Sequence, residues 1–193
     1  MKLAIRPLTP ARWPDLEAIF LAKGCSVARG CWCMYYRLRG APTPPAGMTR
    51  GDFFRKKLRT ITNSGTPPGL IAYHGKIPVG WVTLGPREEF KKLEHSPVMR
   101  PVDDQPVWSI VCFVVPQIYR GHGVAQALLE GAVAFAKKRG AKLVEGYPMD
   151  RQDRPRDDAM WFGTKSMFDR AGFKEVARRK PRRPIVRKRL ARA

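Results

Sequence analysis

The sequence predicts a mixed α/β protein in which residues 1–193 form a single domain. Short runs of strand-forming residues alternate with amphipathic helical patterns along the chain. The strongest strand pattern, at 107–115, is followed shortly by the strongest helical pattern, at 125–139. Apolar residues make up 44% of the chain, which suits one buried core and a folded rather than a disordered protein.

The N-terminal third predicts one strand and two helices. Residues 3–8 have the composition of a strand, and Thr9 followed by proline is typical of a helix start. This helix is expected to end at Gly24. Residues 25–45 show no clear period and are expected to be irregular, whereas residues 50–62 carry a helical pattern.

The middle of the chain predicts a hairpin and a central strand. Residues 69–73 and 78–84 flank the turn His74-Gly-Lys and are expected to pair antiparallel. The polar stretch 86–100 predicts a loop with a short helix. The run 107–115 is apolar except for Ser109, which favours a strand buried in the middle of a sheet.

The C-terminal part predicts two helices and three strands. Glycine directly follows both helical patterns, as expected at the position after a helix. The predicted elements are a helix at 125–139, a strand at 142–147, a charged loop at 150–157, a helix at 158–171, and strands at 173–179 and 184–190 that form a hairpin.

The formal net charge of +21 is partly concentrated at the C-terminus. Residues 178–193 contain nine Lys or Arg and no acid, and removing these nine from +21 leaves +12 on the rest. A basic C-terminal strand or tail would attract nucleic acid, an anionic cofactor or an acidic partner. No signal-peptide pattern and no membrane-length apolar run is present, so a cytoplasmic location is expected.

The four cysteines predict neither a disulfide framework nor a metal site. The chain is not small and Cys-dense, and Cys31-Trp32-Cys33 lacks the Cys-x-x-Cys spacing and the second pair of a zinc site. With Cys25 and a histidine a zinc site stays conceivable, but free thiols that line or underlie a pocket are the preferred interpretation. Cys112 lies within the central strand pattern and is expected to be buried.

The segment Arg120-Gly-His-Gly-Val-Ala125 joins the strongest strand to the strongest helix. Glycines there allow a sharp turn, and the free N–H groups of the helix start can bind an anion. Arg120 adds a charged donor that can contact phosphate. The spacing matches neither the dinucleotide-binding pattern, because residue 126 is Gln, nor a P-loop. A plain glycine turn is the alternative.

The segment from Val114 to Ala125 resembles the acetyl-CoA signature of the GNAT superfamily of N-acetyltransferases, Arg/Gln-x-x-Gly-x-Gly/Ala. Residues 167–173, Met-Phe-Asp-Arg-Ala-Gly-Phe, resemble a later helix-to-strand motif of the same superfamily. The resemblance implies a central, mostly antiparallel sheet flanked by helices. It also implies acetyl-CoA as cosubstrate and direct attack of a primary amine on its thioester. Homodimers occur in this superfamily.

The resemblance further implies where acetyl-CoA binds. The thioester would lie where the strand 107–115 separates from the strand 142–147, and the strand backbone would bind the pantetheine arm. The amides of the glycine loop would hold the pyrophosphate. The implied cofactor-binding residues are Cys112, Phe113, Val114, Arg120, Gly121, His122, Gly123, Val124, Ala125 and Phe168.

The chain departs from the superfamily at the residue that protonates the leaving thiolate. Where the superfamily often has Tyr, this chain has Phe168, so the thiolate leaves unassisted or Ser166 or Tyr147 replaces the Tyr. For the base, Asp150 and Glu145 are candidates, with Tyr147 as a polar group at the strand end. Ordinary surface polarity is the alternative for each. Strand alternation places Glu145 and Tyr147 on one face.

The acceptor side is expected in the segment Gly30–Arg37, where Trp32, Tyr35 and Tyr36 would line a small-molecule pocket. A loop buried against the sheet is the alternative, and the identity of the acceptor does not follow from the sequence. Two other functions stay open. One is a nucleic-acid- or ribosome-associated basic protein, and the other is an acetyl-CoA-binding sensor without turnover.

Overall fold

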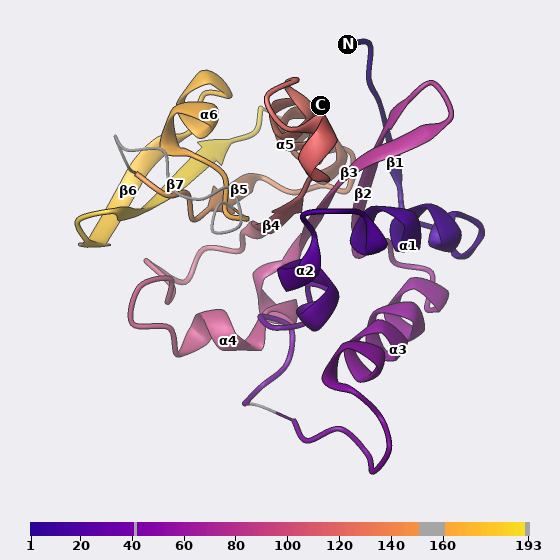
Figure 1. Ribbon diagram of the computed structural model, residues 1–193. Helices are drawn as coiled ribbons and strands as arrows, with labels where there is room; N and C mark the ends of the chain where they lie inside the picture. The colour runs from indigo at the N-terminus through magenta and orange to yellow at the C-terminus, as the bar shows by residue number, and fades with distance from the viewer. Residues whose placement is uncertain (41, 151–160, 192–193) are drawn as a thin grey trace.

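The computed structural model describes residues 1–40, 42–150 and 161–191, and its strands form one sheet with the order β1-β2-β3-β4-β5-β7-β6 (Figure 1). All neighbouring strands pair antiparallel except β4 and β5, which are parallel. The mixed α/β fold with a mostly antiparallel sheet is therefore confirmed. The strands are β1 (Ala4–Pro7), β2 (Gly69–His74), β3 (Ile77–Pro86), β4 (Trp108–Val114), β5 (Leu143–Gly146), β6 (Lys174–Lys180) and β7 (Arg183–Arg189).

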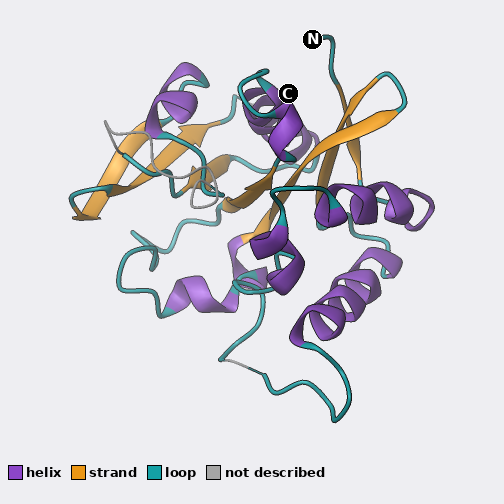
Figure 2. Cartoon of the chain, viewed as in Figure 1, coloured by secondary structure: helices purple, strands orange, loops and turns teal. Residues whose placement is uncertain are grey.

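Helices cover both faces of this sheet (Figure 2). They are α1 (Trp13–Leu21), α2 (Ser26–Cys31), α3 (Arg50–Asn63), α4 (Lys91–Glu94), α5 (Val124–Lys138) and α6 (Lys165–Arg170), with short 3-10 turns at Pro10–Arg12, Arg87–Glu89 and Gln117–Tyr119. Among the described residues, no helix has the length and apolar character needed to cross a membrane.

The hydrophobic core has one part on each face of the sheet and a third at the β5–β7 end. On one face α5 and α6 pack against β2, β3 and β4, with Leu128 and Phe168 fully buried. On the other face α1, α2 and α3 pack together, with Phe20 and Trp81 fully buried. The amphipathic pattern of α5 predicted from the sequence is confirmed, because its apolar stripe is the buried one.

A bulge in β4 changes which side chains face each part of the core. Thr83 of β3 pairs with Cys112 but Leu84 pairs with Ile110, so Val111 is the extra residue. As a result, Ile110 packs with the α5 face, whereas Cys112 packs with the α1–α3 face.

The strands β4 and β5 separate, as the family resemblance in the sequence implies. Their pairing ends at Ile110 and Gly146, whereas β4 continues to Val114. Within the described ranges, the far end of β4 therefore has no strand paired on that side.

Two predictions of secondary structure were wrong. The segment 25–45 contains the helix α2, which ends where Trp32 and Cys33 adopt left-handed conformations with φ of 45° and 53°. The last helix begins at Lys165 rather than near residue 158, because Gly163 has φ of 74° and Thr164 caps the helix by accepting a hydrogen bond from the Met167 N–H. Most of the predicted loop 150–157 lies outside the described residues.

The basic C-terminus forms a strand inside the sheet and not a free tail. The strand β7 lies between β5 and β6, and the predicted hairpin with β6 is confirmed. Arg187 is buried and forms ion pairs with Glu145 and Asp103. Part of the concentrated charge is therefore neutralised within the fold.

Candidate functional site

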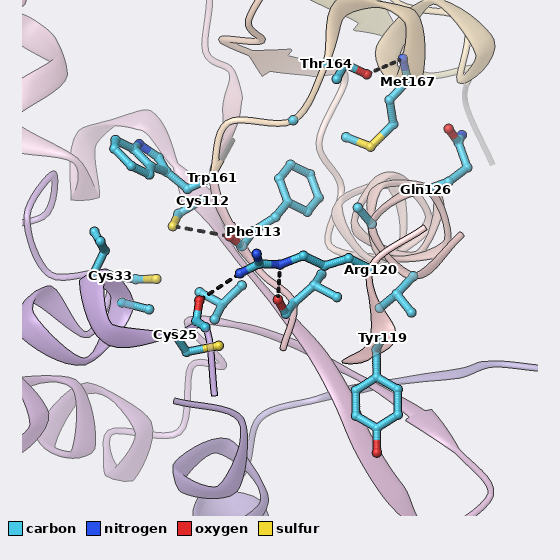
Figure 3. A pocket seen from close by; sticks show the side chains of 18 of the residues that line it. Cys25, Cys33, Cys112, Phe113, Tyr119, Arg120, Gln126, Trp161, Thr164 and Met167 are labelled. Carbon is cyan, nitrogen blue, oxygen red and sulfur yellow. Dashed lines mark hydrogen bonds between the residues drawn. The ribbon is translucent and has the colours of Figure 1, made fainter. Parts of the chain in front are cut away.

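A cavity of about 760 Å³ lies between α2, the open end of β4, the start of α5 and the segment before α6 (Figure 3). Most of its lining is apolar. Its lining includes the glycine loop except His122, the end of β4 and the aromatic segment after α2. Elements from distant parts of the sequence therefore meet at the place where β4 and β5 separate.

The start of α5 presents unpaired backbone N–H groups to this cavity. Gly121 and Gly123 have φ of 77° and 78°, a left-handed conformation that favours glycine. The first hydrogen bond of the helix runs from the Ala127 N–H to the Gly123 carbonyl, so the N–H groups of residues 124–126 have no partner within the helix. These groups and the helix dipole form a site suited to phosphate.

Arg120 holds this loop against the rest of the protein (Figure 3). Its Nε donates to the Val115 carbonyl at 3.1 Å, and its Nη2 donates to the Gly24 carbonyl at 2.7 Å. The neighbouring His122 is exposed, its Nδ1 lies 2.8 Å from the Arg120 carbonyl, and its side chain is not part of the cavity lining. The family resemblance described above implies phosphate contacts for Arg120 and His122. Of the two, only Arg120 lines the cavity.

The backbone edge of β4 is partly occupied. The Phe113 N–H donates to the Trp161 carbonyl, with an N···O distance of 2.6 Å. Neighbouring residues of a strand direct their N–H groups to opposite sides, so Cys112 and Val114 direct theirs toward β3. Of the three residues expected to bind a pantetheine arm through the backbone, Phe113 is the one whose N–H faces the open side.

All four cysteines line the cavity as free thiols. Cys25, Cys33 and Cys112 are buried, and Cys31 is partly buried. Burial raises the pKa of Cys31 to about 12, and the neighbouring Cys33 adds to this increase. Hydrogen bonding to Cys33, together with burial, raises the pKa of Cys112. The thiols of Cys31 and Cys112 are therefore protonated at neutral pH. Within the described ranges, no group of three His, Cys, Asp or Glu side chains is arranged to hold a metal ion.

Two of the three predicted acceptor residues reach the cavity. Tyr35 and Tyr36 line it, with their ring centroids 4.9 Å apart. Trp32 does not line it, which corrects the expectation from the sequence. Its ring is buried in the α1–α3 core, stacked 4.6 Å from Phe20. The left-handed turn after α2 sends Trp32 into the core and Cys33 toward the cavity.

Tyr147 lies inside the protein and not at the cavity. Its hydroxyl donates to Glu145 Oε1 at 2.7 Å and lies 2.8 Å from Ser109 Oγ, so the predicted shared face of Glu145 and Tyr147 is confirmed. Burial raises the pKa of Tyr147 well above its ordinary value. Glu145 is fully buried and also contacts Arg87 and Arg187. This network fixes the loop before β4 and has no access to a substrate in the cavity.

The other predicted catalytic residues also lie outside the cavity lining. Asp150 pairs with Arg178 at 2.6 Å, and the hydroxyl of Ser166 is exposed and 3.1 Å from that of Thr164. Phe168 is fully buried and packs against Gly146, Phe113 and Phe173, so it supports β4 from the core rather than contacting a ligand.

Sequence reasoning missed several lining residues. Trp161, Thr164 and Met167 reach the cavity from the segment before α6 and its first turn, and Arg170 reaches it from the last residue of that helix. Trp161 and Thr164 belong to no motif, and Met167 and Arg170 lie in the helix-to-strand motif without having been assigned to the site, because their position depends on where Gly163 turns the chain toward β4. Gln126 could have been found, since it directly follows the glycine loop on the first turn of α5.

Comparison with known proteins identifies relatives by sequence family and by fold. Residues 32–149 match the sequence model of the acetyltransferase (GNAT) family. A search of curated protein sequences found no match.

Three solved structures illustrate the similarity of fold. The mosquito arylalkylamine N-acetyltransferase-like 5b has a TM-score of 0.58 and 11% identity, over 98% of this chain and 100% of that chain. The polyamine N-acetyltransferase of Drosophila melanogaster has a TM-score of 0.56 and 13% identity, over 98% and 100%. PaiA N-acetyltransferase of Thermoplasma acidophilum, in complex with coenzyme A, has a TM-score of 0.53 and 18% identity, over 98% and 100%. At these identities the similarity concerns the fold alone.

Proposed function

The chain belongs to the acetyltransferase (GNAT) family, and from this premise we propose that it transfers an acetyl group from acetyl-CoA to a primary amine. The observation that carries the proposal is the single cavity that joins the free amides of α5 to the open edge of β4. An anion site next to a strand edge whose Phe113 N–H is bonded only to the Trp161 carbonyl fits a long cosubstrate with a diphosphate at one end and an amide-containing arm. Solved structures of similar fold contain coenzyme A, which supports this assignment.

The diphosphate of acetyl-CoA would bind at the start of α5. The N–H groups of residues 124–126 are the donors, and Gly121 and Gly123 allow the backbone to approach the phosphates closely. Arg170, which is exposed and lines the same part of the cavity, adds a positive charge. Arg120 keeps the loop in place through the carbonyls of Val115 and Gly24.

The pantetheine arm would lie along the open edge of β4. The Phe113 N–H is the donor on this edge, and it now binds the Trp161 carbonyl. We infer that an amide carbonyl of the arm takes the place of Trp161, so that binding exchanges one hydrogen bond for another. The thioester would then lie beside the thiols of Cys33 and Cys112, between the anion site and the tyrosines after α2.

The neutral amine attacks the thioester carbon with its nitrogen lone pair, and a C–N bond forms. The C–S bond breaks and releases the thiolate of coenzyme A. The described lining residues include no Asp, Glu or His, so we propose that water in the cavity takes the proton from the amine. Burial raises the pKa of Tyr36. Its hydroxyl therefore stays protonated at neutral pH and can donate a hydrogen bond but cannot act as a base.

Mass-spectrometric detection of acetylated products, from acetyl-CoA and a panel of primary amines, tests this function. Turnover that depends on both substrates supports the proposal. Binding of acetyl-CoA without transfer to any amine would favour a sensor that does not catalyse. Detection by mass is preferable to a thiol-reactive dye, because the protein has four free cysteines of its own.

A further inference from the structure

One side of the cavity is an aromatic wall built from two segments, the residues after α2 and those before α6. Tyr36 lines the cavity and packs 5.7 Å from Phe162, measured between ring centroids. Trp161 also lines the cavity and packs 5.9 Å from Phe162. Rings on this side favour an acceptor with an aromatic or large apolar group.

Arg183 lies directly behind this wall without a carboxylate partner. Its guanidinium carbon is 4.2 Å from the ring centroid of Phe162. Its positive charge offsets part of the rise that burial causes in the pKa of Tyr36. Its Nε is buried and has no hydrogen-bond partner, and Nη2 has only the sulfur of Met99 at 3.4 Å. Among the described residues no Asp or Glu forms an ion pair with it, in contrast to Arg178 and Arg187 of the same hairpin.

An unpaired, partly buried guanidinium is unusual, because a buried charge is costly unless it is paired and hydrogen-bonded. Burial lowers the pKa of Arg183, which is the sign of this cost. A carboxylate bound on the cavity side of Tyr36 and Phe162 would offset this cost through charge attraction across the rings, without contacting the guanidinium.

Among the described residues, the other charged side chains at the wall and in the cavity lining are positive. Lys92 Nζ lies 3.5 Å from the ring centroid of Tyr35, which is 42% exposed at the cavity. The charged residues in the described lining are Arg120 and Arg170. A polyamine carries several positive charges and would be repelled at this end, whereas a carboxylate would be attracted.

We propose that the amine acceptor carries a carboxylate beside an aromatic or large apolar group, as an aromatic amino acid does, and that Arg183 selects for this carboxylate. The inference rests on the proposed acetyltransferase function and specifies its acceptor. Arg183 does not itself line the cavity, since Tyr36 and Phe162 lie in front of it. It is therefore a residue that determines specificity and is not a catalytic residue.

The test compares an acid with its uncharged analogue. Binding of 3-phenylpropanoate and of 3-phenylpropanamide to the protein saturated with coenzyme A is measured by calorimetry. In parallel, kcat/KM for acetylation is measured for phenylalanine and for phenethylamine, which differ by the carboxylate. In both pairs we expect the acid to be favoured by about tenfold or more, which corresponds to about 1.4 kcal/mol of charge attraction.

Variants of the β6–β7 hairpin show whether Arg183 is the cause. Arg183→Met keeps the apolar stem over Phe162 and should remove the preference for the acid, with little effect on the amide. Arg182→Met removes the same charge from an exposed neighbour and should leave the preference unchanged. If Arg183→Met does not fold, Arg183→Gln serves instead, and the comparison of acid with amide in the unmodified protein still stands.

Equal binding of acid and amide, preference for the amide, binding of neither, or an unchanged preference in Arg183→Met would each overturn this proposal. Failure of the proposed function has a different signature. The protein would then either fail to bind coenzyme A in a titration without the analogues, or bind it and acetylate neither amine, whatever the result with the two analogues.

Discussion

Replacing Glu145 by glutamine removes the negative charge from a carboxylate that is completely buried between two arginines. Its Oε2 accepts from Arg187 Nε at 2.7 Å, and its Oε1 lies 3.4 Å from Arg87 Nη1. The same Oε1 accepts from the Tyr147 hydroxyl at 2.7 Å. Glutamine has nearly the same shape, so the change tests charge and not packing.

The expected loss follows from the burial of this network. Breaking a buried ion pair costs about 3–5 kcal/mol, because the remaining charge is left without compensation. Glutamine still offers one carbonyl oxygen, so we expect the lower end, about 3 kcal/mol. For a chain of 193 residues this corresponds to a decrease in Tm of about 6–12 °C.

Thermal and denaturant unfolding, followed by circular dichroism, measure this loss. Glu175→Gln is the matched control, because Glu175 also pairs with an arginine but on the surface, and the expected loss is less than about 1 kcal/mol. A double-mutant cycle with Arg187→Met isolates the pair. If Glu145→Gln unfolds at the same temperature as the unmodified protein, the network does not fix the loop before β4 as described.

Three further predictions concern the cavity and the residues that shape it. Gly123→Ala places a side chain at φ of 78° and should weaken acetyl-CoA binding by about tenfold in calorimetry. The control Gly140→Ala, at φ of 83° beyond the other end of α5, should lower stability by a similar amount but leave the affinity unchanged. Equal affinities in both variants would contradict the assigned anion site. Cys31 has a pKa of about 12 instead of the ordinary 9.0. Its reaction rate with iodoacetamide should therefore still rise with each pH unit above 9, because its thiolate fraction keeps increasing. A rate that levels off near pH 9, or no protection by acetyl-CoA, would show that this thiol is not buried at the site. Phe168→Tyr should lower the free energy of unfolding by about 1–3 kcal/mol without raising the acetylation rate, since the new hydroxyl would be buried without a partner. A variant that is faster and equally stable would place this residue beside the leaving thiolate.

The fold was predictable where the hydrophobic period of an element and the residues that end the element indicate the same boundaries. The apolar stripe of α5 and the glycine after it, at residue 140, define that helix in sequence and in structure. The short helix α2 was not predictable, because six residues are too few to show a helical period. The start of α6 was also missed, since the apolar residues 159–162 before Gly163 extend the helical pattern beyond the turn that breaks it.

The cosubstrate half of the site was easier to predict than the acceptor half. The glycine loop is continuous in sequence, so its residues stay together in the fold. The acceptor half combines the turn after α2, the residues before α6 and the start of β7, and only tertiary structure brings these together. Neighbouring residues even separate there, since Trp32 enters the core while Cys33 reaches the cavity.

Thermal unfolding with and without acetyl-CoA tests the central claim most directly, in moderate salt so that nonspecific binding to this basic protein is suppressed. At a hundredfold excess over the Kd, a ligand specific for the folded state adds about 2.7 kcal/mol. For a chain of this size we expect Tm to rise by about 5–10 °C, with no such rise from inorganic phosphate. No change in Tm at millimolar acetyl-CoA would contradict the assignment of the cavity as a cosubstrate site.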